Sequence, residues 1–209
     1  MAFTDFKTIA DVQERFLIKY QAADFVRSKV VEVSPKLREE LSFVEQYIDT
    51  RVSEFAIREN LIFPVLREVY KKYAEQFSLW SHRFIKYDEV LVGTPDYFVS
   101  KRSELGKTVL GKPLLLMVEA KKNDFDEGWA QCLAEMVAAQ KLNGNDLLIY
   151  GCVTDGQVWQ FGKLEGAIYT YNDKLFTLDD LAELLGAWDY LYEQIQIQVG
   201  SILPATEAT

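Results

Sequence analysis

Two acidic residues and a lysine stand at the ends of two strand-like segments in the middle of the chain. Asp96 lies at one end of the first segment, and Glu119 and Lys121 end the second, which starts at Leu114. Side chains alternate between the two faces of a strand, so Glu119 and Lys121 are expected on the same face. Carboxylate oxygens are the ligands that hard divalent cations prefer, and a bound cation activates water. The pattern is that of a site that can hold a divalent cation and orient a water molecule.

The apolar run before Glu119 favours this interpretation. Residues 114–118 (LLLMV) form a continuous apolar segment, which is typical of a central strand buried on both faces. A carboxylate at the edge of such a strand loses hydration and needs a partner, which a metal ion beside Lys121 would supply. The alternative is that these acids and lysines are solvated loop residues without chemistry.

Four short segments resemble, in the right order, parts of one group of enzymes. Pro95-Asp96 and Glu119-Ala120-Lys121, with 22 residues between Asp96 and Glu119, resemble the motif of the PD-(D/E)XK nuclease superfamily. Residues 54–64 (EFAIRENLIFP) resemble the first helix of the nuclease domain in the R (motor) subunits of type I restriction enzymes. Gln131 stands where that group often has a glutamine, and residues 154–159, with Thr-Asp-Gly and a tryptophan, resemble its hairpin.

The resemblance, which covers about residues 50–165, implies a fold, a cofactor and a reaction. The implied fold is a restriction-endonuclease-like α/β fold: a mixed central sheet flanked by helices, here with an N-terminal helical extension. The implied reaction is the Mg²⁺-dependent hydrolysis of phosphodiester bonds in DNA, with Mn²⁺ as an alternative ion. Asp96, Glu119 and the Ala120 carbonyl group would hold the metal. The implied catalytic residues are Asp96, Glu119, Lys121, Glu54 and Gln131.

Two positions in this pattern have an alternative interpretation, and a third departs from the pattern. Glu54 stands four residues before Arg58, so a salt link between the two is the alternative to a metal-binding role. Gln131 is otherwise a solvent-facing amide, on a helix face opposite much of the apolar stripe. Glu135 departs from the pattern, because related nucleases carry a tyrosine four residues after the glutamine.

The charge of the chain argues against DNA binding. The formal net charge is −9, whereas proteins that grip duplex DNA are usually basic because phosphate neutralisation dominates their affinity. A local basic strip would still contact phosphates, and the loop between the two acidic strands is the best candidate. An ordinary solvated loop is the alternative. The candidate substrate-binding residues are Lys101, Arg102, Lys107 and Lys122.

Other sequence features exclude several classes of protein. The single histidine, His82, excludes multi-histidine metal sites, and we expect a packed or surface residue. Cys132 and Cys152 lack metal-ligand spacing and are expected to be buried free thiols. No apolar run reaches the roughly 18 residues of a membrane span, and residues 1–16 lack the features of a secretory signal. We therefore expect a cytoplasmic protein without membrane contact.

Hydrophobic periodicity divides the chain into three parts. Residues 1–50 are expected to form the helical extension, 51–200 the nuclease-like domain and 201–209 a disordered tail. Pro64 should kink or divide its helix, and residues 25–33 are either a short strand or an irregular link. The expected helices cover residues 3–24, 37–47, 53–76, 124–142 and 177–195, and the expected strands cover 79–85, 89–99, 114–121, 147–154, 157–163 and 167–171.

Three functions are compatible with the sequence. The first is a metal-dependent endonuclease, a stand-alone relative of the type I R-subunit nuclease domain. The second is a non-catalytic binding or accessory protein of the same fold, which the acidic balance, Glu135 and the missing phosphate-cradling motif of a motor favour. The third is a structural or oligomerising protein that does not respond to Mg²⁺. Candidate partners are DNA, a second copy in a homodimer, and a separate motor or specificity protein.

Overall fold

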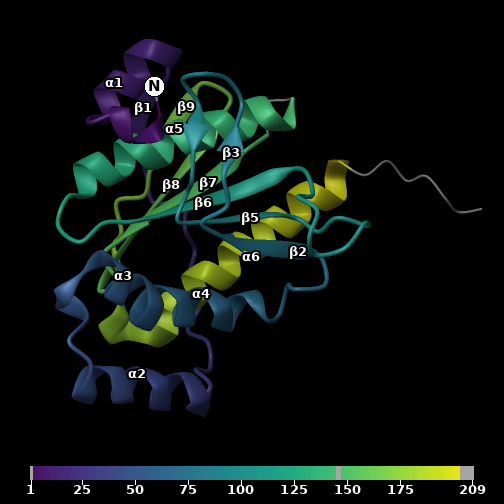
Figure 1. Cartoon of the computed structure of the whole chain (residues 1–209). Helices are drawn as coiled ribbons and strands as arrows, with labels where there is room; N and C mark the ends of the chain where they lie inside the picture. The colour runs from purple at the N-terminus through teal and green to yellow at the C-terminus, as the bar shows by residue number, and fades with distance from the viewer. Residues whose placement is uncertain (1, 145–146, 203–209) are drawn as a thin grey trace, which may run out of the picture.

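One large sheet with helices on both faces forms the centre of the protein. The computed structural model describes residues 2–144 and 147–202 (Figure 1). The strand order is β1-β9-β8-β7-β6-β5-β2, with β10 paired to β8, and most neighbours are antiparallel. The pairs β1–β9 and β6–β7 are parallel. A mixed central sheet flanked by helices is therefore confirmed.

The strands differ in length, and a separate two-stranded sheet of β3 and β4 stands beside the large one. The longer strands at the centre of the large sheet are the most buried, and β6 and β7 are buried along their whole length. The strands are β1 (Lys19–Ala22), β2 (Phe77–Ser81), β3 (Ile85–Lys86), β4 (Val92–Gly93), β5 (Tyr97–Lys101), β6 (Leu114–Ala120), β7 (Ile149–Thr154), β8 (Val158–Glu165), β9 (Ile168–Tyr171) and β10 (Phe176–Thr177).

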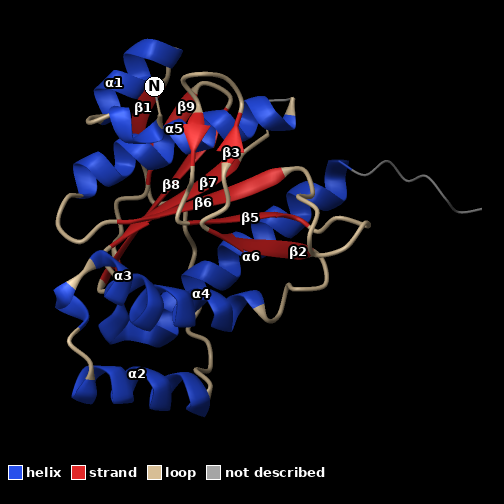
Figure 2. Cartoon of the chain, in the orientation of Figure 1, coloured by secondary structure: helices blue, strands red, loops and turns tan. Residues whose placement is uncertain are grey.

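The helices fall into two groups, one on each face of the sheet (Figure 2). Helices α1 and α5 pack on one face, and α2, α4 and α6 contribute to the core on the other. The helices are α1 (Ile9–Phe16), α2 (Pro35–Tyr47), α3 (Glu54–Ile57), α4 (Phe63–Tyr70), α5 (Phe125–Asn143) and α6 (Leu181–Ile202), with 3-10 turns η1 (Phe3–Asp5), η2 (Thr50–Val52) and η4 (Leu178–Asp180) and the π-helical turn η3 (Arg58–Ile62).

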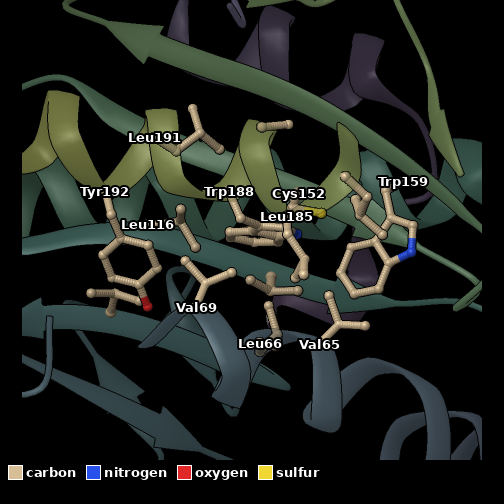
Figure 3. Close-up of a cluster of buried hydrophobic side chains, with 14 of the residues drawn as sticks. Val65, Leu66, Val69, Leu116, Cys152, Trp159, Leu185, Trp188, Leu191 and Tyr192 are labelled. Atoms are coloured by element: carbon tan, nitrogen blue, oxygen red, sulfur yellow. The ribbon is translucent and has the colours of Figure 1, made fainter. Parts of the chain in front are cut away.

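The core under α6 is almost entirely apolar (Figure 3). Trp188 of α6 packs edge-on against Trp159 and Phe161 of β8, with ring centroids 5.8 and 5.2 Å apart. Leu191 lies in the same cluster and has no solvent exposure. Full burial of a side chain of this size contributes about 1.5–3 kcal/mol, so this face holds much of the stability of the fold.

The helix predicted over residues 53–76 is divided, as its proline indicates. Ser53 caps α3 by accepting a hydrogen bond from the backbone N–H of Ala56. A π-helical turn then precedes α4, in which the N–H of Phe63 donates to the carbonyl of Arg58, five residues back. Pro64 has no N–H to continue the regular pattern, and the wider turn accommodates this loss. The helical segment ends at Tyr70, earlier than predicted.

Two strands predicted before β6 are interrupted. The prediction for residues 79–85 was wrong beyond Ser81, because His82 adopts a left-handed backbone conformation (φ 49°) and turns the chain away from the sheet. The prediction for 89–99 was also too long, because the Asp88 carboxylate accepts the N–H groups of Val90 and Leu91 and forms a turn. Only β4 and the start of β5 remain of that strand.

The N-terminal extension is only partly helical. Residues 19–22, predicted as helix, form β1 and extend the large sheet by pairing with β9, because Leu17 ends α1 in a left-handed conformation (φ 56°). Residues 25–33 form the irregular link, one of the two alternatives for that segment. Helix α6 continues to Ile202, and residues 203–209 of the predicted tail lie outside the described residues.

Candidate active site

Strand pairing brings Asp96 and Glu119 together. Tyr97 of β5 pairs with Val118 of β6 in an antiparallel register, so Asp96 and Glu119 occupy opposite positions one step further along. The backbone N–H of Ala120 donates to the Asp96 Oδ2 atom at 2.8 Å. Both carboxylates are buried, with 5% and 6% exposure. The antiparallel register thus places two acids against each other at one edge of the core.

Lys121 lies beside Glu119, as strand alternation predicts. The Lys121 Nζ atom is 3.8 Å from Glu119 Oε1, and the Lys121 backbone N–H donates to the carbonyl of Thr154. The side-chain stem of Lys121 passes under α5 at Gly128, where an added Cβ would lie 2.8 Å from Lys121 Cγ. A glycine at this point lets the helix approach the lysine closely and confine it.

Arg58 connects the acids to the divided helix. Its Nη2 atom lies 3.0 Å from Asp96 Oδ1 and also forms an ion pair with Glu54. The expected Glu54–Arg58 salt link is therefore confirmed. Arg58 also pairs with Asp96, which was not predicted. The hairpin turn at Gly156 supports this helix, because a Cβ there would lie 2.9 Å from Ile57 and 3.1 Å from Leu61.

His82 also borders the site, where sequence analysis predicted a packed or surface residue. Its Nε2 atom lies 3.5 Å from both Asp96 Oδ1 and an Arg58 Nη atom. The Ser81 hydroxyl lies 2.9 Å from His82 Nδ1, and the His82 backbone N–H donates to the Asp96 carbonyl. The left-handed turn at His82 places the imidazole against Asp96, and no local sequence signal predicts such a turn at a histidine.

Helix α5 covers the carboxylates from above and carries two further polar side chains. Gln131 and Glu135 are only 3% and 2% exposed, so the solvent-facing interpretation of Gln131 was wrong. Gln131 donates to Glu127 at 3.1 Å, and no described contact joins it to Asp96 or Glu119. From the sequence, Glu135 stands out only as a departure from the pattern of related nucleases. A signal was present, since residues 128–139 are apolar almost all round, which is typical of a fully buried helix.

Burial, and after it the charges of neighbouring acids, raise the pKa values of three carboxyl groups at the site. Burial raises the pKa of Glu119 well above its usual value, the charge of Asp96 adds to this effect, and Lys121 opposes it. Burial likewise raises the pKa of Asp96, against the opposing effects of Arg58 and the Ala120 N–H. Burial followed by the charges of Glu119 and Asp96 raises the pKa of Glu135 well above its usual value. The site therefore has a shortage of positive charge.

The chemistry of the donor set fits a hard divalent cation. Four carboxylates interact here (Glu54, Asp96, Glu119 and Glu135), against two permanent cations, Arg58 and Lys121. With all acids ionised the imbalance is two negative charges, which one divalent ion would neutralise. Carboxylate and carbonyl oxygens are the ligands of Mg²⁺. Among residues 2–144 and 147–202, however, no three His, Cys, Asp or Glu side chains are grouped closely enough to ligate a metal together.

The predicted phosphate-binding residues lie at two different ends of the β5–β6 hairpin. Lys101 ends β5, and Arg102 donates to the carbonyl of Ala74, so the basic loop leaves the sheet at the end away from Asp96. Lys107 belongs to that loop. Lys122 instead follows Lys121 directly and lines a groove of about 1070 Å³ together with Arg38 and Arg51 of the α2–α3 region. Lys122 thus follows β6 at the carboxylate end of the hairpin, with its Nζ atom donating to the Arg51 carbonyl, and the other three residues lie at the opposite end.

Cys132 and Cys152 are buried free thiols, as predicted.

Comparison of the chain with known protein families found no match, and comparison with curated proteins found no similar sequence. In the part of the chain that the structure describes, no helix has both the length and the apolar character needed to cross a membrane.

Proposed function

We propose that this protein is a Mg²⁺-dependent nuclease with a restriction-endonuclease-like fold, which hydrolyses phosphodiester bonds in DNA. The observation that carries the proposal is the opposition of Asp96 and Glu119 across the β5–β6 register, with Lys121 at 3.8 Å from Glu119. An antiparallel hairpin, a covering helix and a parallel third strand surround this pair. The resemblance to R-subunit nuclease domains of type I restriction enzymes rests on the same residues.

Asp96, Glu119 and the carbonyl of Ala120 are the residues that would hold the cation, and Mn²⁺ is an alternative to Mg²⁺. When bound, such a cation lowers the pKa of water and stabilises negative charge on a phosphate. The Ala120 N–H fixes Asp96 through a hydrogen bond of 2.8 Å, which leaves the orientation of its carboxylate defined. Burial of both acids excludes bulk water and strengthens their attraction for a cation.

The cationic side chains have separate roles in this proposal. Lys121 stands beside Glu119 with 17% side-chain exposure, where its ammonium group orients water and neutralises charge that develops on the phosphate. Arg58 holds Glu54 and Asp96 in fixed positions through two ion pairs. Glu54 binds a water of the cation rather than the cation itself, at the point where its helix approaches Asp96. Gln131, one turn before Glu135 on α5, has a positioning role only, because its amide donates to Glu127 and not to the acids of the site.

A second candidate is a non-catalytic binding or accessory protein of the same fold. One observation favours it: the guanidinium group of Arg58 already occupies Asp96 Oδ1 and also pairs with Glu54. An arginine that neutralises the acids permanently would remove the need for a metal. The net charge of −9 points in the same direction.

Nicking of supercoiled plasmid DNA by wild type and Asp96→Asn, with Mg²⁺, Mn²⁺ or EDTA, separates the candidates. We expect metal-dependent nicking by the wild type and a loss of at least about 100-fold in the variant, because removing a ligand costs more than removing its outer-shell partner. Asp126→Asn, an exposed acid on α5, is the matched control and should keep full activity. Metal binding by calorimetry without nicking in any ion would favour the accessory protein, and no metal binding at all would exclude the nuclease.

A further inference from the structure

Glu135 is one of four residues in the described part of the chain that have a fully buried side-chain polar atom without a hydrogen-bond partner, and it is the one carboxyl group among them. It lies in the middle of α5 with 2% exposure, inside a helix segment that is buried from Gly128 to Gln140. Its Oε2 atom is fully buried and has no hydrogen-bond partner in the described residues. An unpaired carboxylate oxygen in such a place costs free energy, commonly about 1–3 kcal/mol for a neutral group and more for a charged one. A residue of this kind needs an explanation.

The packing of α5 on β6 directs Glu135 to the acids. Lys121 passes under Gly128, and Cys132 Sγ lies 3.9 Å from the carbonyl of Met117, two residues before Glu119. The helix therefore begins above the site and runs back along the strand. Side chains of a helix lean toward its N-terminus, so Glu135, on the same side as Cys132, leans toward the site. Glu119, Asp96 and Lys121 are the charged residues that act on its carboxyl group.

Direct metal ligation by Glu135 does not agree with the geometry, since no three acidic side chains in residues 2–144 and 147–202 are grouped closely enough. A contact through water does agree. Mg²⁺ keeps several of its waters when proteins bind it through one or two carboxylates. Those waters need acceptors, and a buried oxygen without a protein donor is one.

We infer that Glu135 is a positioning residue of the site: its unpaired oxygen accepts a hydrogen bond from a water in the hydration shell of the cation that Asp96 and Glu119 hold. The inference rests on the proposed function and extends it. Related nucleases carry a tyrosine at this position, so here a carboxylate takes the place of a phenol. The negative charge of Glu135 also attracts the cation without direct contact and so increases the affinity of the site for it.

The test is a Mn²⁺ and Mg²⁺ titration by calorimetry, combined with thermal unfolding in EDTA and in each metal. We expect Glu135→Gln to bind Mn²⁺ about 10–100-fold more weakly than the wild type, the usual loss for an outer-shell partner. The metal-induced rise in melting temperature should shrink accordingly. Asp126→Asn on the same helix should match the wild type in both measurements, and Glu135→Asp, which restores a carboxylate, should recover part of the affinity.

Glu135→Met keeps the test valid if the glutamine variant folds poorly. In EDTA it should melt at or above the wild-type temperature, because it removes an unpaired buried carboxylate, yet its response to Mn²⁺ should be weak. Wild-type affinity in both Glu135→Gln and Glu135→Met would overturn the inference and leave the proposed function intact. A folded wild type that binds neither metal would overturn both, and Asp96→Asn would then behave like the wild type.

Discussion

Helices α5 and α6 are the two longest in the protein and cover opposite faces of one sheet, yet their buried surfaces differ in kind. On α6 the buried side chains carry no charge, and their only polar groups are the indole N–H of Trp188 and the phenol of Tyr192; they are Leu184, Leu185, Ala187, Trp188, Leu191, Tyr192 and Ile195. On α5 the buried face includes Gln131, Glu135 and Gln140 among its apolar residues. The same sheet thus has a face for stability and a face that carries charge.

The difference between the two faces shows which buried polar groups destabilise the fold. Gln140 donates to the carbonyls of Leu147 and Leu164 and is satisfied, as buried polar groups usually are. Glu135 is not satisfied, and its pKa and those of Asp96 and Glu119 are raised by burial. Residues held in unfavourable surroundings are concentrated at functional sites, and the stable packing of α6 offsets that cost.

The largest effect is expected on the α6 face. Leu191→Ala should reduce the free energy of unfolding by about 2–5 kcal/mol, since it leaves a cavity in the cluster around Trp188. Urea unfolding measures this loss, with Glu193→Ala, an exposed position on the same helix, as the control that should change little. The affinity of Leu191→Ala for Mn²⁺ should remain that of the wild type. A variant that lost metal binding without unfolding would contradict the division into two faces.

A smaller effect, with a pH dependence, is expected on the α5 face. The pKa of Glu119 is raised in the folded state by burial, so above about pH 4.3 this carboxyl group keeps its proton in the folded protein over a range in which the unfolded chain has lost it. The free energy of unfolding therefore decreases as the pH rises from the unfolded-state pKa of Glu119 to its folded-state pKa. The loss is about 1.4 kcal/mol for each unit by which the pKa is raised. Between pH 5 and pH 8 in EDTA, the melting temperature of the wild type should fall more steeply than that of Glu119→Gln.

Asp126→Asn is the control for this pH dependence, because its carboxylate is exposed, and its curve should run parallel to that of the wild type. Saturating Mg²⁺ should flatten the fall in the wild type, since the cation stabilises the ionised acids. Equal slopes of melting temperature against pH for Glu119→Gln and the wild type in EDTA would contradict this, because they would show that ionisation of Glu119 does not destabilise the folded protein.

The sequence predicted secondary structure well where a local signal acts. Asp124 accepts the N–H of Glu127 and opens α5, Gly144 (φ 73°) ends it, and Asp155-Gly156 forms the expected turn between β7 and β8. Where pairing with a distant strand decides, the prediction failed. Residues 19–22 have a helix-like apolar pattern around them, but β9 offers an open edge and the segment forms a strand there.

The same distinction between local and long-range effects applies to the residues of the candidate site. Asp96, Glu119 and Lys121 follow from strand alternation and from the register of neighbouring strands, which the apolar pattern sets. Glu135 and His82 depend on how α5 lies across the sheet and on one left-handed backbone turn, and neither follows from local spacing. The uniformly apolar character of residues 128–139 does predict that polar residues within them are buried, and this rule would have drawn attention to Glu135.

The smallest expected effect compares the two ends of the β5–β6 hairpin. Lys122 follows β6 at the acidic end of the hairpin, where its Nζ atom donates to the Arg51 carbonyl, and Lys107 lies in the loop at the other end; we expect a phosphate contact from Lys122 rather than from Lys107. Binding of a short DNA duplex in EDTA should weaken slightly in Lys122→Gln, and the negative slope of log affinity against log salt should become less steep by about 0.9, which corresponds to one phosphate contact. Lys107→Gln is the matched control and should leave the slope unchanged. The reverse result would place the DNA along the basic loop, because the salt slope counts phosphate contacts wherever they occur, and the carboxylate end would then lie outside the duplex footprint.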